Sequence, residues 1–249
     1  MIQITDLTKN YGKSTILDRL NLTIDAGQVY CLLGKNGAGK TTLINLILDL
    51  IEKNNGSIQI FGVDHRQLDK TAKMRIGVVN EDLALIEEIS GYEFLFFVGK
   101  IYKIPAETLK KRINDLFSYF FEDASDLKKN IARYSTGMKK KIAFCASVIH
   151  TPDILILDEP FSGLDPFVAN QMITFVKKYH REDRIILISS HDLSYVEKVS
   201  THIGVLDNHQ LVFNSTIGNF TKNGANEVDA ALLSILKPNE SEIDKIDWV

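Results

Sequence analysis

The chain has 249 residues, of which 45% are hydrophobic and 24% are charged. This is the composition of a globular protein, and it excludes disorder over most of the chain. The formal net charge of −3 excludes the overall basic field that drives nucleic-acid binding, so we expect no nucleic-acid partner.

The first third of the chain predicts strands interrupted by one glycine loop and a helix. Residues 2–5 and 20–24 alternate between apolar and polar side chains, and residues 29–33 (VYCLL) form an apolar run suited to burial on both faces of a sheet. The loop GKNGAGKTT follows, and then TTLINLILDL has helical spacing. Two more runs, SIQIF and RIGVV, predict strands that end at residue 79.

The middle of the chain predicts helices, and the remainder alternates between strand and helix. After Pro105, apolar residues recur on one helical stripe, at Leu109, Ile113, Leu116, Phe117 and Phe120. Strand patterns then occur at residues 153–160, 184–189, 202–207 and 210–213, with helical patterns at 168–179 and 193–199. This alternation predicts an α/β fold with a mostly parallel sheet and right-handed crossovers.

No segment has the pattern of an export signal or a transmembrane helix. The N-terminus lacks a basic stretch followed by an apolar one. The longest apolar runs, such as FLFFV, are much shorter than the roughly 20 residues that span a bilayer. Cys31 and Cys145 lie apart in apolar runs, as buried thiols do in a reducing cytosol. We expect a protein that does not cross a membrane by itself.

Residues 34–41 (GKNGAGKT) match the phosphate-loop pattern G-x-x-x-x-G-K-[ST] between a predicted strand and a predicted helix. Glycines allow backbone N–H groups to surround phosphate oxygens, and the helix N-terminus adds its positive end. Lys40 supplies a charge for the terminal phosphates, and Thr41 a hydroxyl for Mg²⁺. The nucleotide-binding candidates here are Gly34, Asn36, Gly37, Gly39, Lys40, Thr41 and Thr42.

Two acids and a histidine follow later apolar strands. Asp158 and Glu159 end ILILDE, at the carboxyl edge of the sheet where nucleotides bind, so Asp158 is a candidate Mg²⁺ ligand and Glu159 a candidate acceptor for the proton of an attacking water. The alternative is a pair of acids that begins a surface loop. His191 closes another strand and could sense the terminal phosphate, or be an ordinary surface histidine.

Together with YSTGM (134–138) and SGLD (162–165), these motifs resemble, in order and spacing, the nucleotide-binding subunit of an ATP-binding cassette (ABC) transporter. The resemblance covers residues 1 to about 214. It implies a P-loop NTPase (RecA-like) core at 1–80 and 152–214, which includes an N-terminal antiparallel β subdomain, and an inserted α-helical subdomain at 81–151. Residues 215–249 form a C-terminal tail.

The resemblance also implies an Mg²⁺-dependent ATPase that works as a head-to-tail dimer. Each ATP would lie between the phosphate loop of one subunit and the signature loop of the other, here Ser135 and Gly137. The partner ATPase would be a second copy or a different chain. A separate transmembrane permease would hold the assembly at the inner face of the cell membrane, with the ATPase in the cytoplasm.

The signature departs from the usual Leu-Ser-Gly-Gly-Gln at Tyr134, Thr136 and Met138. These departures resemble ATPases of small bacterial exporters for peptides, drugs or lantibiotics, so we expect an exporter. The alternatives are the ATPase of an importer and a soluble cassette ATPase that acts on a nucleoprotein or ribosome. The latter typically carries a second cassette or a long coiled coil, and this chain has one phosphate loop.

Three further positions follow from the family pattern. Glu81 occupies the place of a glutamine that contacts Mg²⁺; a carboxylate can bind the metal but adds negative charge beside a polyphosphate. If the loop is shifted, Glu81 is a surface acid instead. Tyr11 matches the aromatic residue that stacks on adenine, or is simply a tyrosine in a turn. Asp165 would face the dimer partner.

Residues 81–102 are the expected lining of a groove that receives a permease helix. We expect most of its aromatic cluster, Phe94, Phe96 and Phe97, to belong to the core, so that the segment is a contact surface only in part. In the tail, we expect a short helix around residues 228–236 whose Leu232, Leu233 and Leu236 could stabilise a dimer. The acidic end, residues 239–247, is expected to be partly mobile.

Overall fold

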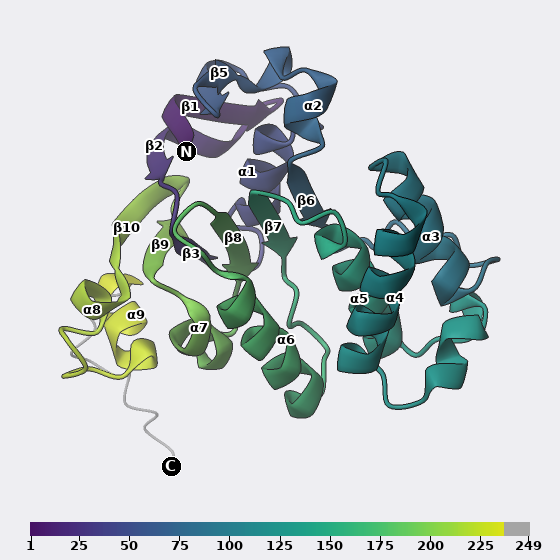
Figure 1. Cartoon of the computed structure of the whole chain (residues 1–249). Helices are drawn as coiled ribbons and strands as arrows, with labels where there is room; N and C mark the ends of the chain where they lie inside the picture. Colours follow the sequence, from purple (N-terminus) through teal and green to yellow (C-terminus); the bar gives the residue numbers. More distant parts are fainter. Residues whose placement is uncertain (237–249) are drawn as a thin grey trace.

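The computed structural model describes residues 1–236, which contain two β-sheets flanked by helices (Figure 1). The N-terminal sheet is antiparallel, with strand order β2-β1-β4-β5. Its strands are β1 (Ile2–Tyr11), β2 (Ser14–Ile24), β4 (Asn55–Ile60) and β5 (Val63–Asp64). β1 and β2 extend well beyond the short runs expected from the sequence. Register shifts in their pairing interrupt the alternation of buried and exposed residues, so the sequence pattern indicated only part of each strand.

The second sheet has six strands in the order β10-β9-β3-β8-β7-β6. They are β3 (Val29–Leu33), β6 (Ile76–Val79), β7 (Ile154–Asp158), β8 (Ile185–Ser190), β9 (His202–Asp207) and β10 (Gln210–Thr216). All neighbours pair in parallel except β9 and β10. The parallel strands therefore bring their carboxyl ends to one edge, where the phosphate loop, the acids after β7 and His191 lie.

Helices cover both faces of this sheet. The longer ones are α1 (Lys40–Ile47), α3 (Gly91–Ile101), α4 (Ala106–Phe120), α5 (Thr136–Val148), α6 (Pro166–Tyr179), α7 (Leu193–Val199) and α9 (Val228–Leu236). Short helices are α2 (Lys70–Lys73), α8 (Ile217–Phe220), η1 (His65–Gln67), η2 (Ala124–Lys128) and η3 (Ile131–Arg133). In Figure 1, α3, α4 and α5 form a group beside β6, away from the N-terminal sheet. The predicted α/β architecture is confirmed.

Successive residues of the central strands enter two different cores. Cys31 and Leu155 pack with α3 to α7, whereas Leu32 and Ile156 pack with α1 and the N-terminal sheet. This two-sided burial explains why β3, β7 and β8 are apolar without alternation. Cys31 and Cys145 are buried free thiols, as predicted.

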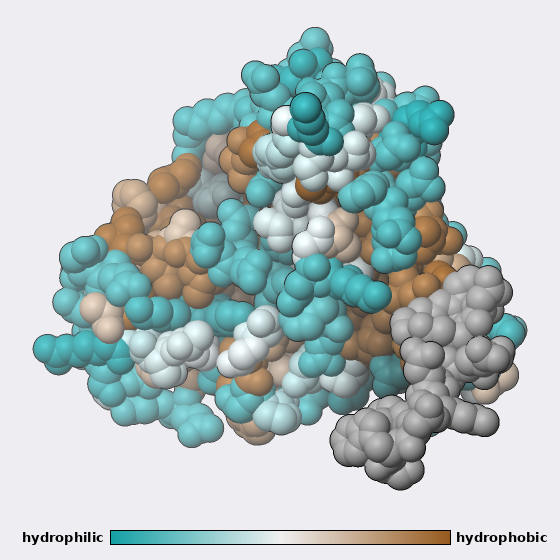
Figure 2. Space-filling view, turned by 180° about the vertical axis from the view of Figure 1, so that it is seen from behind, coloured by the Kyte–Doolittle hydropathy of each residue, from teal (hydrophilic) through white to brown (hydrophobic). Residues whose placement is uncertain are grey.

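The helical stripe of α4 is confirmed at four of its five positions, because Leu109, Ile113, Phe117 and Phe120 are buried; Leu116 is only half-buried. The aromatic residues of α3 divide differently: Phe94 is buried, whereas Phe97 is 49% exposed. A core assignment is therefore right for Phe94 and wrong for Phe97. On the face shown in Figure 2, apolar residues are exposed on the side of the molecule where these helices lie.

The tail contains the expected helix, α9. Leu232 and Leu236 pack partly against the chain's own core, and Leu233 is exposed. The three leucines thus do not share one free apolar face. The acidic segment 239–247 lies outside the described residues. Within residues 1–236, every helix is too short or too polar to span a bilayer.

Candidate active site

The phosphate loop connects the end of β3 to α1, and steric constraints require glycine at several of its positions. A Cβ at Gly34 would lie 2.7 Å from the carbonyl oxygen of Leu206 on the adjacent strand. Gly37 and Gly39 have φ angles of 81° and 106°, which side chains strongly disfavour. The loop can therefore keep this backbone shape only with glycine at these positions.

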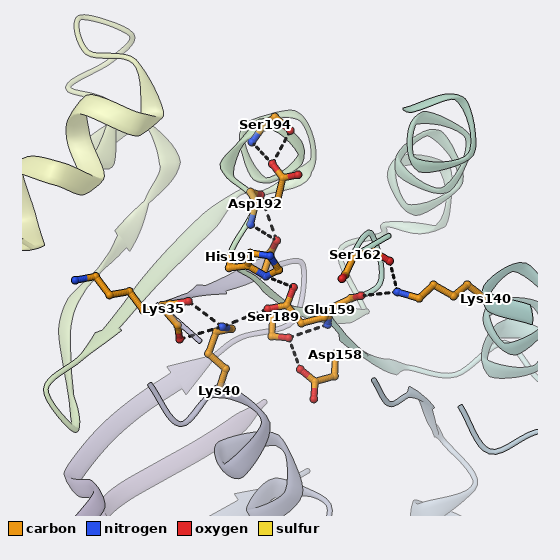
Figure 3. Close-up of polar contacts among 12 residues, drawn as sticks. Lys35, Lys40, Lys140, Asp158, Glu159, Ser162, Ser189, His191, Asp192 and Ser194 are labelled. Carbon is orange, nitrogen blue, oxygen red and sulfur yellow. Dashed lines mark hydrogen bonds and ion pairs between the residues drawn. The ribbon is translucent and has the colours of Figure 1, made fainter. Parts of the chain in front are cut away.

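Lys40 is the first residue of α1, and its side chain points back under the loop (Figure 3). Its Nζ donates to the carbonyl oxygen of Gly34 at 2.8 Å and lies 3.2 Å from Oε1 of Glu159. Both side chains of this ion pair are less than 10% exposed. Because a buried charge is costly without a partner, each group holds the other in place.

The second carboxylate oxygen of Glu159 contacts His191, which follows β8. Nδ1 of His191 lies 2.9 Å from Oε2 of Glu159, and the imidazole is 45% exposed. The carboxylate is thus held by one group on each oxygen, a buried ammonium and a solvent-facing imidazole. A base oriented in this way by neighbouring groups is the arrangement that proton transfer requires.

Ser189, in β8, links the two acids at the end of β7. Its hydroxyl donates to Oδ1 of Asp158 and accepts a hydrogen bond from the backbone N–H of Glu159 at 2.9 Å. Sequence reasoning missed Ser189, although a serine pair that ends the apolar run IILISS was a usable signal. With Asp158 2% exposed, this contact sets the direction of its carboxylate.

These groups surround a pocket of about 470 Å³. The pocket is lined by Ile16, Asn36, Gly37, Gly39, Lys40, Thr41, Thr42, Glu81, Glu159, Ser162 and His191. Most of the predicted nucleotide-binding residues therefore lie together. Ile16 is an addition that no motif indicated, and Ser162 belongs to the SGLD motif but was not a predicted site residue. Gly34 and Asp158 lie just behind the lining residues, through the contacts described above.

The donor set at the pocket suits Mg²⁺. Thr41 and Glu81 line the pocket and offer a hydroxyl and a carboxylate, and Asp158 offers a buried carboxylate just behind the lining residues. Mg²⁺ prefers oxygen ligands, and is usually bound by one or two carboxylates together with phosphates and water. The residues present fit that ion.

Tyr11 and Asp165 lie apart from the lining residues. Tyr11 ends β1 and is 51% exposed, and Nζ of Lys9 lies 4.6 Å from its ring centre. Asp165 caps α6, because its carboxylate accepts from the N–H of Val168 at 3.0 Å. This capping gives Asp165 a structural reason for its identity that the sequence motif did not indicate.

Ser135 and Gly137 also lie away from the pocket of their own chain, at the N-terminus of α5. Ser135 caps the helix by accepting from the N–H of Met138 at 3.3 Å. Tyr134, a departure from the family pattern, is buried, and its hydroxyl donates to the carbonyl oxygen of Asp126 at 2.7 Å. The aromatic substitution therefore fills the core of the helical region.

A glycine loop between a buried strand and a helix, with two acids at the end of another parallel strand of the same sheet, defines the class of P-loop nucleotide-binding proteins. Within this class, the chain belongs to the ABC transporter family, whose model matches residues 17–162. This finding confirms the family resemblance of the motifs.

Curated relatives cover most of the chain. A bacitracin transport ATP-binding protein of Enterococcus faecalis is 33% identical over 213 residues, which are 85% of this chain and 68% of the relative. A lantibiotic transport ATP-binding protein of Streptococcus pyogenes is 34% identical over 206 residues, 83% of this chain and 86% of the relative.

Solved structures agree in fold. The structure of an ATP-binding subunit of an ABC transporter covers 95% of this chain and 100% of its own, with a TM-score of 0.86 and 25% identity. A dimeric ATP-binding cassette bound to ADP and phosphate has a TM-score of 0.78 at 22% identity, covering 87% of this chain and 99% of its own.

Proposed function

We propose that the chain is the ATP-hydrolysing subunit of a membrane exporter. The main support for this proposal is the position of the Glu159 carboxylate. It lies between Lys40 and His191 at the pocket formed by the phosphate loop. The relatives act in the transport of bacitracin and of lantibiotics, which favours export of peptides, lipids or drug-like compounds.

In the proposed reaction, the loop N–H groups and Lys40 neutralise charge on the transferring phosphoryl group. Lys40 then exchanges its contact with Glu159 for phosphate oxygens, which frees Oε1 of Glu159 to accept a proton from the attacking water. His191 keeps the other carboxylate oxygen oriented. Mg²⁺, held by Thr41, Asp158 and Glu81, would supply further charge neutralisation at the phosphates.

The proposed assembly contains two ATPase chains and a permease. Ser135 and Gly137 would complete the pocket of the second chain, either another copy or a different ATPase, with Asp165 near the boundary. Tyr11, exposed at the end of β1, would stack on adenine. A hollow of about 300 Å³ between β6, α3 and α5, lined by Val98 and Ala146 among others, has the size and apolar character for a helix end of a permease at the cytoplasmic membrane surface.

The replacement Glu159→Gln tests the proposed reaction. We expect ATP binding within about threefold of the wild type, hydrolysis lowered by roughly 10²-fold or more because the proton acceptor is lost, and an ATP-dependent dimer in size-exclusion chromatography. Glu107→Gln, at an 89% exposed side chain, is the matched control and should hydrolyse ATP normally. Turnover near the wild-type rate in Glu159→Gln would remove Glu159 from this role.

A further inference from the structure

Lys140 is a half-buried cation that the proposed reaction does not use. It lies in the second turn of α5, and its Nζ donates to the carbonyl oxygen of Ser162 and, at 3.4 Å, to that of Glu159 (Figure 3). Both acceptors belong to the loop that follows β7. Lys140 therefore joins the helix that carries Ser135 and Gly137 to the loop that carries Glu159.

The ammonium group of Lys140 also shares a small cavity with Glu81. The cavity measures about 10 Å³, roughly the space of one water, and four of its lining residues are charged: Glu81, Lys140, Asp158 and Glu159. Lys140 takes part in none of the ion pairs formed within residues 1–236, so no carboxylate neutralises its charge by direct contact. Burial lowers the pKa of Lys140, while the negative charges of Glu81 and Glu159 oppose that effect.

Glu81 places a negative charge on the wall of a pocket that, in the proposed function, receives a polyphosphate. Like charges there weaken anion binding unless a cation compensates. Lys140 lines the small cavity together with Glu81, whereas Lys40, which lines the phosphate pocket, is paired with Glu159.

We propose that Lys140 is a positioning residue with two effects: its charge compensates Glu81 beside the nucleotide, and its hydrogen bonds hold the loop of Glu159 against α5. The first effect acts on nucleotide affinity and the second on turnover. This inference rests on the proposed ATPase function, but its affinity part can be measured without hydrolysis.

The test compares Glu81→Gln, Lys140→Gln and the double variant. Affinity is measured with a fluorescent ATP analogue in excess EDTA, so that the metal plays no part. Lys140→Gln should raise Kd about five- to tenfold, because an uncompensated carboxylate then faces the phosphates, and Glu81→Gln alone should lower Kd about two- to fivefold. The double variant should return Kd to within about twofold of the wild type.

Turnover separates the two effects. Lys140→Gln should lower kcat about tenfold, since a shorter neutral side chain no longer holds both carbonyl groups. The double variant should keep this low kcat although its Kd is restored, and Lys140→Arg should preserve both quantities. If the wild type does not hydrolyse ATP, the proposed function fails, but the Kd comparison still decides the charge compensation.

Lys139→Gln is the matched control, because it removes the same charge one residue away. Its ammonium pairs with Glu87 at 2.6 Å on the surface, so Kd and kcat should stay within about twofold of the wild type. The inference is overturned if Lys140→Gln leaves Kd unchanged, or if the double variant binds as weakly as Lys140→Gln. If Lys140→Gln does not fold, Glu81→Gln alone decides the question, because Glu81 is exposed and its replacement should not disturb the fold. An unchanged Kd in Glu81→Gln then also overturns the inference.

Discussion

At the level of single residues, Glu159 combines a costly backbone conformation with a fully partnered side chain. Its φ angle of 47° lies in the left-handed region, which costs a non-glycine residue on the order of 1 kcal/mol. Lys40 and His191 bind its carboxylate, and Ser189 binds its N–H. The neighbours therefore stabilise a conformation that directs the carboxylate into the pocket.

A second residue with an unusual environment is His150, at the end of α5. Its ring stacks on Tyr102 with 3.6 Å between ring centres, and Nε2 lies 3.3 Å from the carbonyl oxygen of Ile76. Burial lowers the pKa of His150 to about 4. The neutral imidazole is thus the form that the fold accommodates.

This shift predicts a pH dependence of stability. Below pH 6.5 the unfolded chain binds a proton at His150, whereas the folded chain binds it only near pH 4. The free energy of unfolding therefore decreases as the pH is lowered from 6.5 to 4. The loss should be about 2 kcal/mol at pH 5 and about 3 kcal/mol at pH 4. His150→Phe keeps the stacking but cannot bind a proton, so urea denaturation at pH 7 and pH 5 should show a smaller difference than in the wild type. Equal differences in both proteins would contradict this assignment.

At the level of elements, the position of α5 depends on its close packing against β6. A Cβ at Gly77 would lie 2.1 Å from the carbonyl oxygen of Ser147 and 2.7 Å from Cγ of Pro152. The helix backbone therefore rests directly on the strand. Because Lys140 and Ser135 lie along the same helix, this contact also sets their distance from the sheet.

Gly77→Ala should push α5 away from β6. We expect a loss of roughly 1 to 3 kcal/mol in the free energy of unfolding, because the atoms that the new methyl group meets are backbone and a proline ring. Urea denaturation measures it. The same change at Gly218 in α8, where the nearest atom is a side-chain oxygen of Asn223 at 3.1 Å, should be neutral or stabilising by up to about 1 kcal/mol. Equal effects at the two glycines would show that the contact does not constrain α5.

At the level of the whole molecule, the phosphate pocket and the N-terminus of α5 are separate within one chain. Glycine in a helix costs about 1 kcal/mol relative to alanine. At Gly137 an added Cβ would meet only Leu164, at an ordinary 3.8 Å, so packing within the chain does not require glycine there. Close approach of a ligand bound to another chain would explain it.

The variant Ser135→Ala/Gly137→Asp tests the composite site. ATP should still bind to the monomer, because neither residue lines its pocket, while hydrolysis should fall by about 10²-fold as the new carboxylate repels the phosphates of the partner's nucleotide. In the Glu159→Gln background the ATP-dependent dimer should disappear from size-exclusion chromatography. Normal hydrolysis would show that Ser135 and Gly137 do not complete a second pocket.

Features that depend on residues close together in the sequence could be predicted from the sequence alone. The phosphate loop is one, since its N–H groups, Lys40 and Thr41 act through consecutive backbone positions. The buried strands and the stripe of α4 are others, because the period of apolar residues follows from the geometry of each element.

Contacts between residues far apart in the sequence could not be predicted from the sequence alone. Ser189 reaches Asp158 because β7 and β8 are adjacent and in register, and Lys140 reaches the carbonyl oxygen of Ser162 because α5 packs against β6, the strand next to β7. Phe94 and Phe97 lie in the same helix with equal hydrophobicity, yet one is buried and the other exposed. Local spacing thus determined the chemistry that the chain carries, whereas strand order and helix packing decided which groups meet, because contact between remote residues depends on where each element packs.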